Sequence, residues 1–208
     1  MNDVRIVPLD RGDLGQVAEV SVRAFDDYPL MAELFPGPPG DPRRAAVARC
    51  FYTPAVADCF EFGVVDAAMD GERLAGYCAW IEPGAYPLSL RRNLAFLPMA
   101  RETLRRYPRR ARRGIQSLVR LEKHHPNTPE HWYLAAIAVD PDYQGRGVGQ
   151  QLIAPGLARA DAHGQPAFLE TTRPTARDWY ERLGFAVRTE VAAFSGGPPE
   201  WFQWRDPA

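Results

Sequence analysis

Hydrophobic and polar positions follow two periodicities along the chain, and their order predicts a mixed α/β fold. Short runs that are apolar or alternate at every second position are typical of strands, and longer runs that repeat at every third or fourth position are typical of helices. The predicted strands are 4–10, 61–70, 72–82, 131–140, 166–172, 185–194 and 200–205. The predicted helices are 13–25, 43–60, several turns within 87–126, 147–164 and 176–184.

Turn and helix-breaking residues divide these runs. Asp70-Gly71 lies between two strand-like runs and predicts a hairpin. Asp13 is placed to cap the first helix. Pro54 and Pro155 fall inside helical patterns, where a missing amide donor predicts an interruption or a shortened helix. One strand–helix–strand unit, between residues 131 and 171, predicts a parallel strand pair. We expect one domain over 1–208, with a helical insert at about 87–126.

Composition excludes several classes of protein. The 208 residues carry a formal net charge of −1, so no global field favours nucleic acid or anionic lipid. Within the arginine-rich insert, Ala111, Ile115, Leu118 and Val119 recur at helical spacing, which predicts a buried apolar side and a solvated basic side. The three cysteines form no close pair, and the first residues lack an apolar signal core, so we expect a cytoplasmic protein without a membrane span. The four histidines lack zinc-site spacing, which predicts surface histidines and no metal.

The stretch "VDPDYQGRGVGQ" (139–150) carries the strongest chemical signal. Gly145, Gly147 and Gly149, with Arg146 among them, join a predicted strand to a helix. Bare backbone amides and the helix dipole favour an anion there, so the turn suits a pyrophosphate. A P-loop needs Gly-Lys-Ser/Thr, which is absent. A dinucleotide fold needs the Gly-x-Gly-x-x-Gly spacing and several strand–helix–strand units.

Two motifs carry a resemblance to a known family. "LAAIAVDPDYQGRGVGQQLI" resembles the acyl-CoA signature of the GNAT N-acetyltransferases, and "WYERLGF" (179–185) resembles their second signature. The resemblance implies a central, mostly antiparallel sheet with one parallel, splayed pair flanked by helices. It implies acetyl-CoA as co-substrate, without a metal. The residues implied in cofactor binding are Ile137, Ala138, Val139, Gln144, Gly145, Arg146, Gly147, Val148, Gly149 and Gln150.

The resemblance also assigns roles in catalysis. The Val139 amide is expected to polarise the thioester carbonyl, and Tyr180 to protonate the leaving thiolate. Ala176 stands where many members carry an asparagine that contacts CoA, so that contact is in doubt. Glu170 ends an apolar strand, where partial burial would raise its pKa towards that of a usable base. Glu170 could equally anchor the substrate ammonium, because paired charges perturb pKa values as readily as catalytic ones.

The acceptor side is predicted from acidic and aromatic residues. Asp27, Tyr28, Trp80 and Glu170 are the candidate substrate contacts, with Asp26 as a further carboxylate. The expected activity is acetyl-CoA-dependent acetylation of a primary amine on a small molecule, possible acceptors being aminoacyl-nucleoside-like, by direct attack on the thioester. A protein or peptide acceptor remains an alternative, as does a non-catalytic acyl-CoA-binding module. Nucleic-acid and membrane partners are not expected, and the chain would be a monomer or a homodimer.

Overall fold

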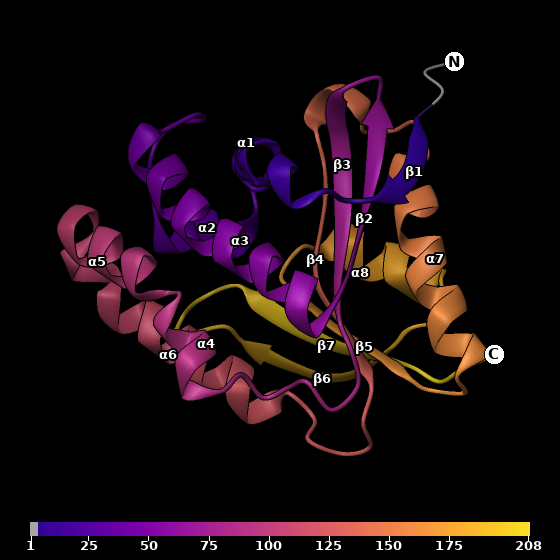
Figure 1. Cartoon of the computed structure of the whole chain (residues 1–208). Helices are drawn as coiled ribbons and strands as arrows, with labels where there is room; N and C mark the ends of the chain where they lie inside the picture. The colour runs from indigo at the N-terminus through magenta and orange to yellow at the C-terminus, as the bar shows by residue number, and fades with distance from the viewer. Residues whose placement is uncertain (1–3) are drawn as a thin grey trace.

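A seven-stranded sheet organises the protein, and the computed structural model describes residues 4–208 of it (Figure 1). The strands follow the spatial order β1-β2-β3-β4-β5-β7-β6. Their bounds are β1 (Arg5–Pro8), β2 (Gly63–Asp70), β3 (Arg73–Ile81), β4 (Trp132–Val139), β5 (Ala167–Thr171), β6 (Ala186–Ala192) and β7 (Pro199–Arg205). Every predicted strand is present, and the hairpin turns at Gly71, whose φ of 60° suits glycine.

One strand pair is parallel, and it is short. β4 and β5 pair only at Trp132–Ala167 and Tyr133–Phe168, after which the two strands separate. All other neighbours are antiparallel, and each of those pairs runs for four residues or more. The predicted fold class, a mostly antiparallel sheet with one parallel splayed pair, is confirmed.

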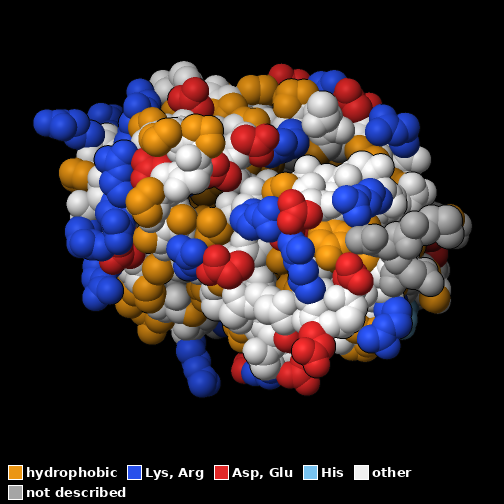
Figure 2. All heavy atoms as spheres, turned by 90° about the horizontal axis from the view of Figure 1, so that it is seen from above, with side chains coloured by type: hydrophobic (Ala, Val, Ile, Leu, Met, Phe, Trp, Pro, Cys, Tyr) orange, Lys and Arg blue, Asp and Glu red, His pale blue; other side chains and the backbone are white. Residues whose placement is uncertain are grey.

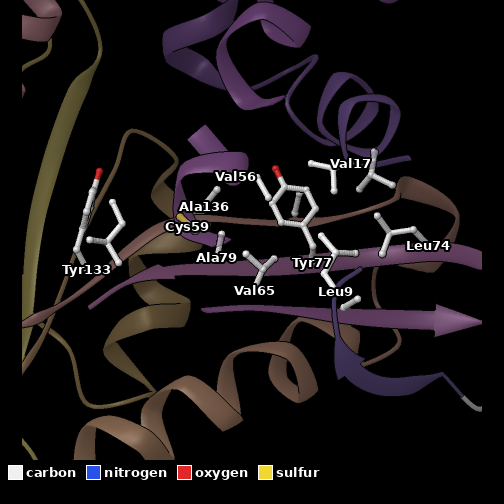
Figure 3. Packing of buried hydrophobic residues seen from close by; sticks show 14 of the residues in the cluster. Leu9, Val17, Val56, Cys59, Val65, Leu74, Tyr77, Ala79, Tyr133 and Ala136 are labelled. Atoms are coloured by element: carbon white, nitrogen blue, oxygen red, sulfur yellow. The ribbon is translucent and has the colours of Figure 1, made fainter. Parts of the chain in front are cut away.

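Helices cover both faces of the sheet. Their bounds are α1 (Leu14–Ala24), α2 (Pro29–Leu34), α3 (Pro42–Phe62), α4 (Leu90–Leu94), α5 (Leu97–Arg106), α6 (Ala111–His124), α7 (Val148–Ala162) and α8 (Pro174–Glu181). On one face, α1 and α3 pack over β2 to β4 with Val17, Val56 and Tyr77 in a common core (Figure 3). On the other face, α7 and α8 pack through a second core. No helix within residues 4–208 is long and apolar enough to span a bilayer.

Both helices with a proline in their interior continue through it, so the predicted interruption and shortening are wrong. Pro54 lies within the 21 residues of α3, and Pro155 within the 15 residues of α7. An internal proline costs about 3 kcal/mol. Burial of one helix face against the sheet, including Val56 in α3 and Leu152 in α7, offsets that cost. Asp13 likewise makes no side-chain capping bond to α1.

The predicted orientation of α6 is also wrong. Ile115, Leu118 and Val119 are exposed by 63%, 46% and 61%, although they form the apolar stripe of this helix. Polar residues occupy the side that faces the protein, where Arg120 bonds the carbonyl of Ala192 and the His124 ring lies 5.3 Å from that of Phe202. These contacts turn the stripe towards solvent. In Figure 2, basic and apolar side chains mix on the left side, where α5 and α6 lie.

Candidate active site

The separation of β4 from β5 leaves backbone groups of β4 without strand partners. Asp140 donates its amide to the Ala75 carbonyl on β3 at 2.9 Å. Because successive amides of a strand point to opposite edges, the Ile137 and Val139 amides face away from β3. β5 has already diverged from that edge. The Gln144 side chain donates to the Val139 carbonyl at 2.9 Å, while the amides of Ile137 and Val139 both face the open edge.

The glycine turn follows directly and opens α7. Gly145 and Gly147 have φ values of 73° and 78°, in the left-handed region that favours glycine. No atom lies within 4 Å of the position that a Cβ would take at either residue. The first amides of α7 have no helical acceptors, as at any helix N-terminus. The turn therefore combines open backbone, unpaired amides and the positive end of a helix dipole.

Buried polar contacts hold this turn in place. Asp140 is 3% exposed, accepts from the Asp142 amide at 2.9 Å and pairs with Arg23 of α1 at 2.8 Å. The Tyr143 hydroxyl donates to Asp70 in the hairpin at 2.8 Å. Arg146 is exposed beside the glycines. This arrangement fits the pyrophosphate of acetyl-CoA, since oxygens can approach the backbone where side chains are absent.

Tyr180 lies in α8 with its ring in the core under the splay. Its side chain is only 6% exposed, and burial raises its pKa well above the ordinary value. The ionisable groups of Tyr28, Cys78 and Glu170 raise that pKa further. No group within residues 4–208 hydrogen-bonds its hydroxyl. A phenol in this state keeps its proton and can donate it to a strong base that forms beside it.

Glu170 is the most perturbed carboxylate near the splay. Burial raises its pKa to about 8, against a hydrogen bond from Tyr133 that lowers it. The Tyr133 hydroxyl donates to Oε1 at 2.7 Å, while Oε2 is buried and has no partner within residues 4–208. One oxygen is thus oriented by the protein and the other is left for a ligand. A carboxylate with this pKa can accept a proton near neutral pH.

The other predicted acceptor contacts fall in different places. The Tyr28 hydroxyl lies at the end of β5, 2.8 Å from the Thr172 amide, which donates to it. Asp27 beside it is exposed and pairs with Arg173 at 2.6 Å. Trp80 is fully buried on the α7 face, where its indole fills the space next to Gly156. The structure brings Tyr28 to the splay with Glu170 and Tyr180, and it leaves Trp80 out of that group.

Sequence reasoning missed two residues of this region. Tyr133 orients Glu170, and Glu200 on β7 is a second carboxylate that is only 2% exposed. A glutamate at the head of an aromatic strand, "EWFQWR", was the available signal for Glu200. A cavity of about 430 Å³ lies elsewhere, between the end of α3 and Arg92. Its lining contains none of these residues, so we do not assign it to the reaction.

The expectation of surface histidines is wrong for two of the four. His125 and His131 are 3% and 7% exposed, and their Nε2 atoms lie 3.1 Å apart. The His125 ring also stacks on Tyr86 with ring centres 3.6 Å apart. Burial lowers the pKa of His125 to about 3, so the pair is uncharged. Within residues 4–208, no group of three or more His, Cys, Asp or Glu residues could hold a metal ion.

A strand splay, a glycine turn at a helix N-terminus and a buried tyrosine define an acyl-CoA-dependent acetyltransferase site. The profile of the acetyltransferase (GNAT) family matches residues 28–185, and the chain belongs to that family. Its members use acetyl-CoA as co-substrate.

Solved structures share the fold over nearly the whole chain. One is titled histone acetyltransferase HPA2 and related acetyltransferase, from Corynebacterium glutamicum; it is 24% identical, with a TM-score of 0.69 over 99% of this chain and 97% of that one. Arylalkylamine N-acetyltransferase 2 from Aedes aegypti is 14% identical, with a TM-score of 0.67 over 100% of both chains. The ribosomal-protein-S18-alanine N-acetyltransferase from Escherichia coli is 15% identical, with a TM-score of 0.57 over 99% of this chain and 95% of that one.

Proposed function

We propose that this acetyltransferase transfers the acetyl group of acetyl-CoA to a primary amine of a small molecule by direct attack on the thioester. One observation carries the proposal: Glu170 is buried beside the splay with one oxygen bonded to Tyr133 and the other without a partner. A base oriented in this way can take a proton from an amine that lies in the gap between β4 and β5. The whole chain would act as one catalytic domain, with α4 to α6 as an insert.

Each role in the reaction falls to a different group of the chain. Acetyl-CoA, when bound, supplies the acetyl group as a thioester. The amides around Gly147 hold its pyrophosphate, and the Val139 amide donates to the carbonyl oxygen as negative charge grows there. Glu170 accepts the proton of the attacking amine. Tyr180 donates its proton to the departing sulfur. Glu170 acts in its ionised form as the proton acceptor, and Tyr180 acts in its neutral form as the proton donor, so each step has its own partner.

A small-molecule acceptor is supported by the residues around the splay. Tyr133 bonds Glu170, and Tyr28 bonds the next residue of β5, Thr171, so aromatic side chains as well as a carboxylate lie beside the gap. The segments "FDDYP", "GQPAFLETT" and "WYERLGFAV" resemble those of puromycin N-acetyltransferase, which favours an aminoacyl-nucleoside-like acceptor and a role in antibiotic resistance. The helices of the insert would cover the acceptor side, whereas an enzyme that modifies proteins needs an open groove.

The test is acetyl-CoA consumption with a panel of amines. Puromycin, spermidine, simple alkylamines and a lysine peptide should be compared, with the Glu170→Gln variant as control. We expect turnover with small amines and a loss of about 100-fold or more in the variant. Turnover with the peptide alone would overturn the small-molecule assignment. Binding of acetyl-CoA without turnover on any amine would indicate a binding module.

A further inference from the structure

Glu200 is a second buried carboxylate beside the proposed acceptor site, and no step described above uses it. Its side chain is 2% exposed, and Oε2 has no hydrogen-bond donor within residues 4–208. The positive charge of Arg120 in α6 lowers the pKa of Glu200. The guanidinium of Arg120, however, donates its hydrogen bond to the carbonyl of Ala192. A buried carboxylate without a donor is strongly disfavoured, so we expect a donor from outside the chain.

Strand register places Glu200 next to Glu170 on the same face of the sheet. Glu170 on β5 pairs with Phe202 on β7, and Glu200 lies two residues from Phe202 along that strand. Diagonal neighbours of this kind are about 7–8 Å apart. The alternate residue Gln203 points to the opposite face, where it donates to the carbonyl of Arg177 in α8. Both glutamates therefore face the side that α6 covers.

The two carboxylates together have more unpaired acceptor oxygens than one ammonium group can bond. Each has a buried Oε2 without a donor. Burial raises the pKa of Glu200 to about 7, and the charge of Glu200 adds to the burial that raises the pKa of Glu170. The acceptor amine occupies Glu170 when it gives up its proton, which leaves Glu200 for a different group. Resting on the proposed function, we infer that Glu200 binds a second, protonated nitrogen of the acceptor, so that dibasic amines are the preferred substrates.

The helix α6 lies over this face with nearly all of its residues partly or fully exposed. Of the fourteen residues of α6, only Ser117 is buried. The helix contacts the β7 face through half-buried polar residues, among them Arg120 and His124. The positive charge of Arg120 also lowers the pKa of Glu200, against the burial that raises it.

Matched amines test this inference. Putrescine and cadaverine differ from butylamine and pentylamine only by a second nitrogen at the far end. We expect a lower KM for the diamines in the wild type. Glu200→Gln should raise the diamine KM about 10- to 100-fold, the value of a lost charged hydrogen bond, and should raise the monoamine KM far less. Glu181→Gln on the exposed surface of α8 is the matched control and should leave all four amines unchanged.

Further variants and a binding measurement separate the outcomes. Glu200→Asp keeps the charge but moves the carboxylate back by one methylene, so the KM of putrescine should rise more than that of the longer cadaverine. Equal KM values for diamines and monoamines in the wild type would overturn the inference and leave the proposed function intact. Calorimetric binding of cadaverine that depends on Glu200, without acetyl-CoA consumption, would support the site and overturn the proposed function. Absence of both binding and preference would overturn the inference.

Discussion

At the scale of single residues, burial raises two pKa values in the same direction and produces opposite roles. The pKa of the Glu170 carboxyl group rises to about 8, into the range where the group exchanges a proton near neutral pH. The pKa of the Tyr180 phenol rises well above 10, so the hydroxyl stays protonated at any working pH. Loss of hydration disfavours the charged form of both groups. The same physical cause thus prepares an acceptor of protons and a donor of protons on the two sides of one gap.

Replacing Tyr180 tests the donor. Tyr180→Phe removes the hydroxyl and keeps the ring contact with Phe185, whose centre lies 5.8 Å away. We expect kcat to fall about 100-fold with little change in the KM for acetyl-CoA, because only a transition-state proton donor is lost. Steady-state kinetics with a small amine measure both values. Wild-type turnover in this variant would show that Tyr180 serves only to pack the core.

Replacing Glu170 tests the acceptor through stability. The folded pKa of about 8 exceeds the ordinary value of 4.5, so between these values the folded protein binds more protons than the unfolded chain. The free energy of unfolding must then fall as the pH rises through that window, by on the order of 5 kcal/mol. Glu170→Gln should flatten this fall in urea unfolding at pH values across the window. An unchanged slope, equal to that of Glu181→Gln, would contradict the raised pKa.

At the scale of elements, the sequence predicts what is local and misses what depends on packing. Alternation and turn residues were enough for the hairpin at Gly71 and for the glycine turn before α7. The apolar stripe of α6 suggested the wrong orientation, because polar bonds from Arg120 hold the opposite side against the sheet. The burial of His125 and His131 depends on rings from distant strands, such as Phe168. The spacing of residues along the chain cannot predict such contacts between distant segments.

The candidate site shows the same division. The glycine turn and "WYERLGF" are continuous motifs, so they could be found in the sequence. The link from Tyr133 to Glu170 joins two strands, and Glu200 becomes a neighbour of Glu170 only through the register of β5 and β7. Trp80 shows the converse error, since an aromatic residue suited to a ligand lies under α7 instead.

The backbone of the glycine turn can be tested against a matched glycine. Gly147 and Gly164 lie at opposite ends of α7 with φ values of 78° and 60°, and neither has an atom within 4 Å of a Cβ position. Alanine at either site should cost about 1 kcal/mol of stability. Only Gly147→Ala should weaken CoA binding, by about tenfold or more in calorimetry, and Gly147→Val should abolish it. Equal CoA affinity in both alanine variants would place the pyrophosphate elsewhere.

At the scale of the whole molecule, the splay joins the two faces of the sheet. The glycine turn begins α7 on one face of the sheet. Glu170 and Glu200 lie on the opposite face, which α6 covers. Charge is divided as well: residues 87–126 carry eleven Lys and Arg against two Glu, while the chain as a whole has a net charge of −1. The acidic groups of the site therefore lie under the most basic part of the protein. A cationic acceptor has to approach past that charge, so added salt should raise its association rate.

The two-residue ladder between β4 and β5 also makes β4 a strand with one protected edge. The amides of Ala138 and of Asp140, just after β4, bond to β3 and should exchange their hydrogens with solvent slowly, whereas those of Ile137 and Val139, which alternate with them, should exchange fast. The chain would show alternating slow and fast positions. Addition of acetyl-CoA should slow the exchange of the Val139 amide and leave its neighbours unchanged, which amide exchange followed by NMR can resolve. Uniform protection along β4 without CoA would mean that the gap closes in solution.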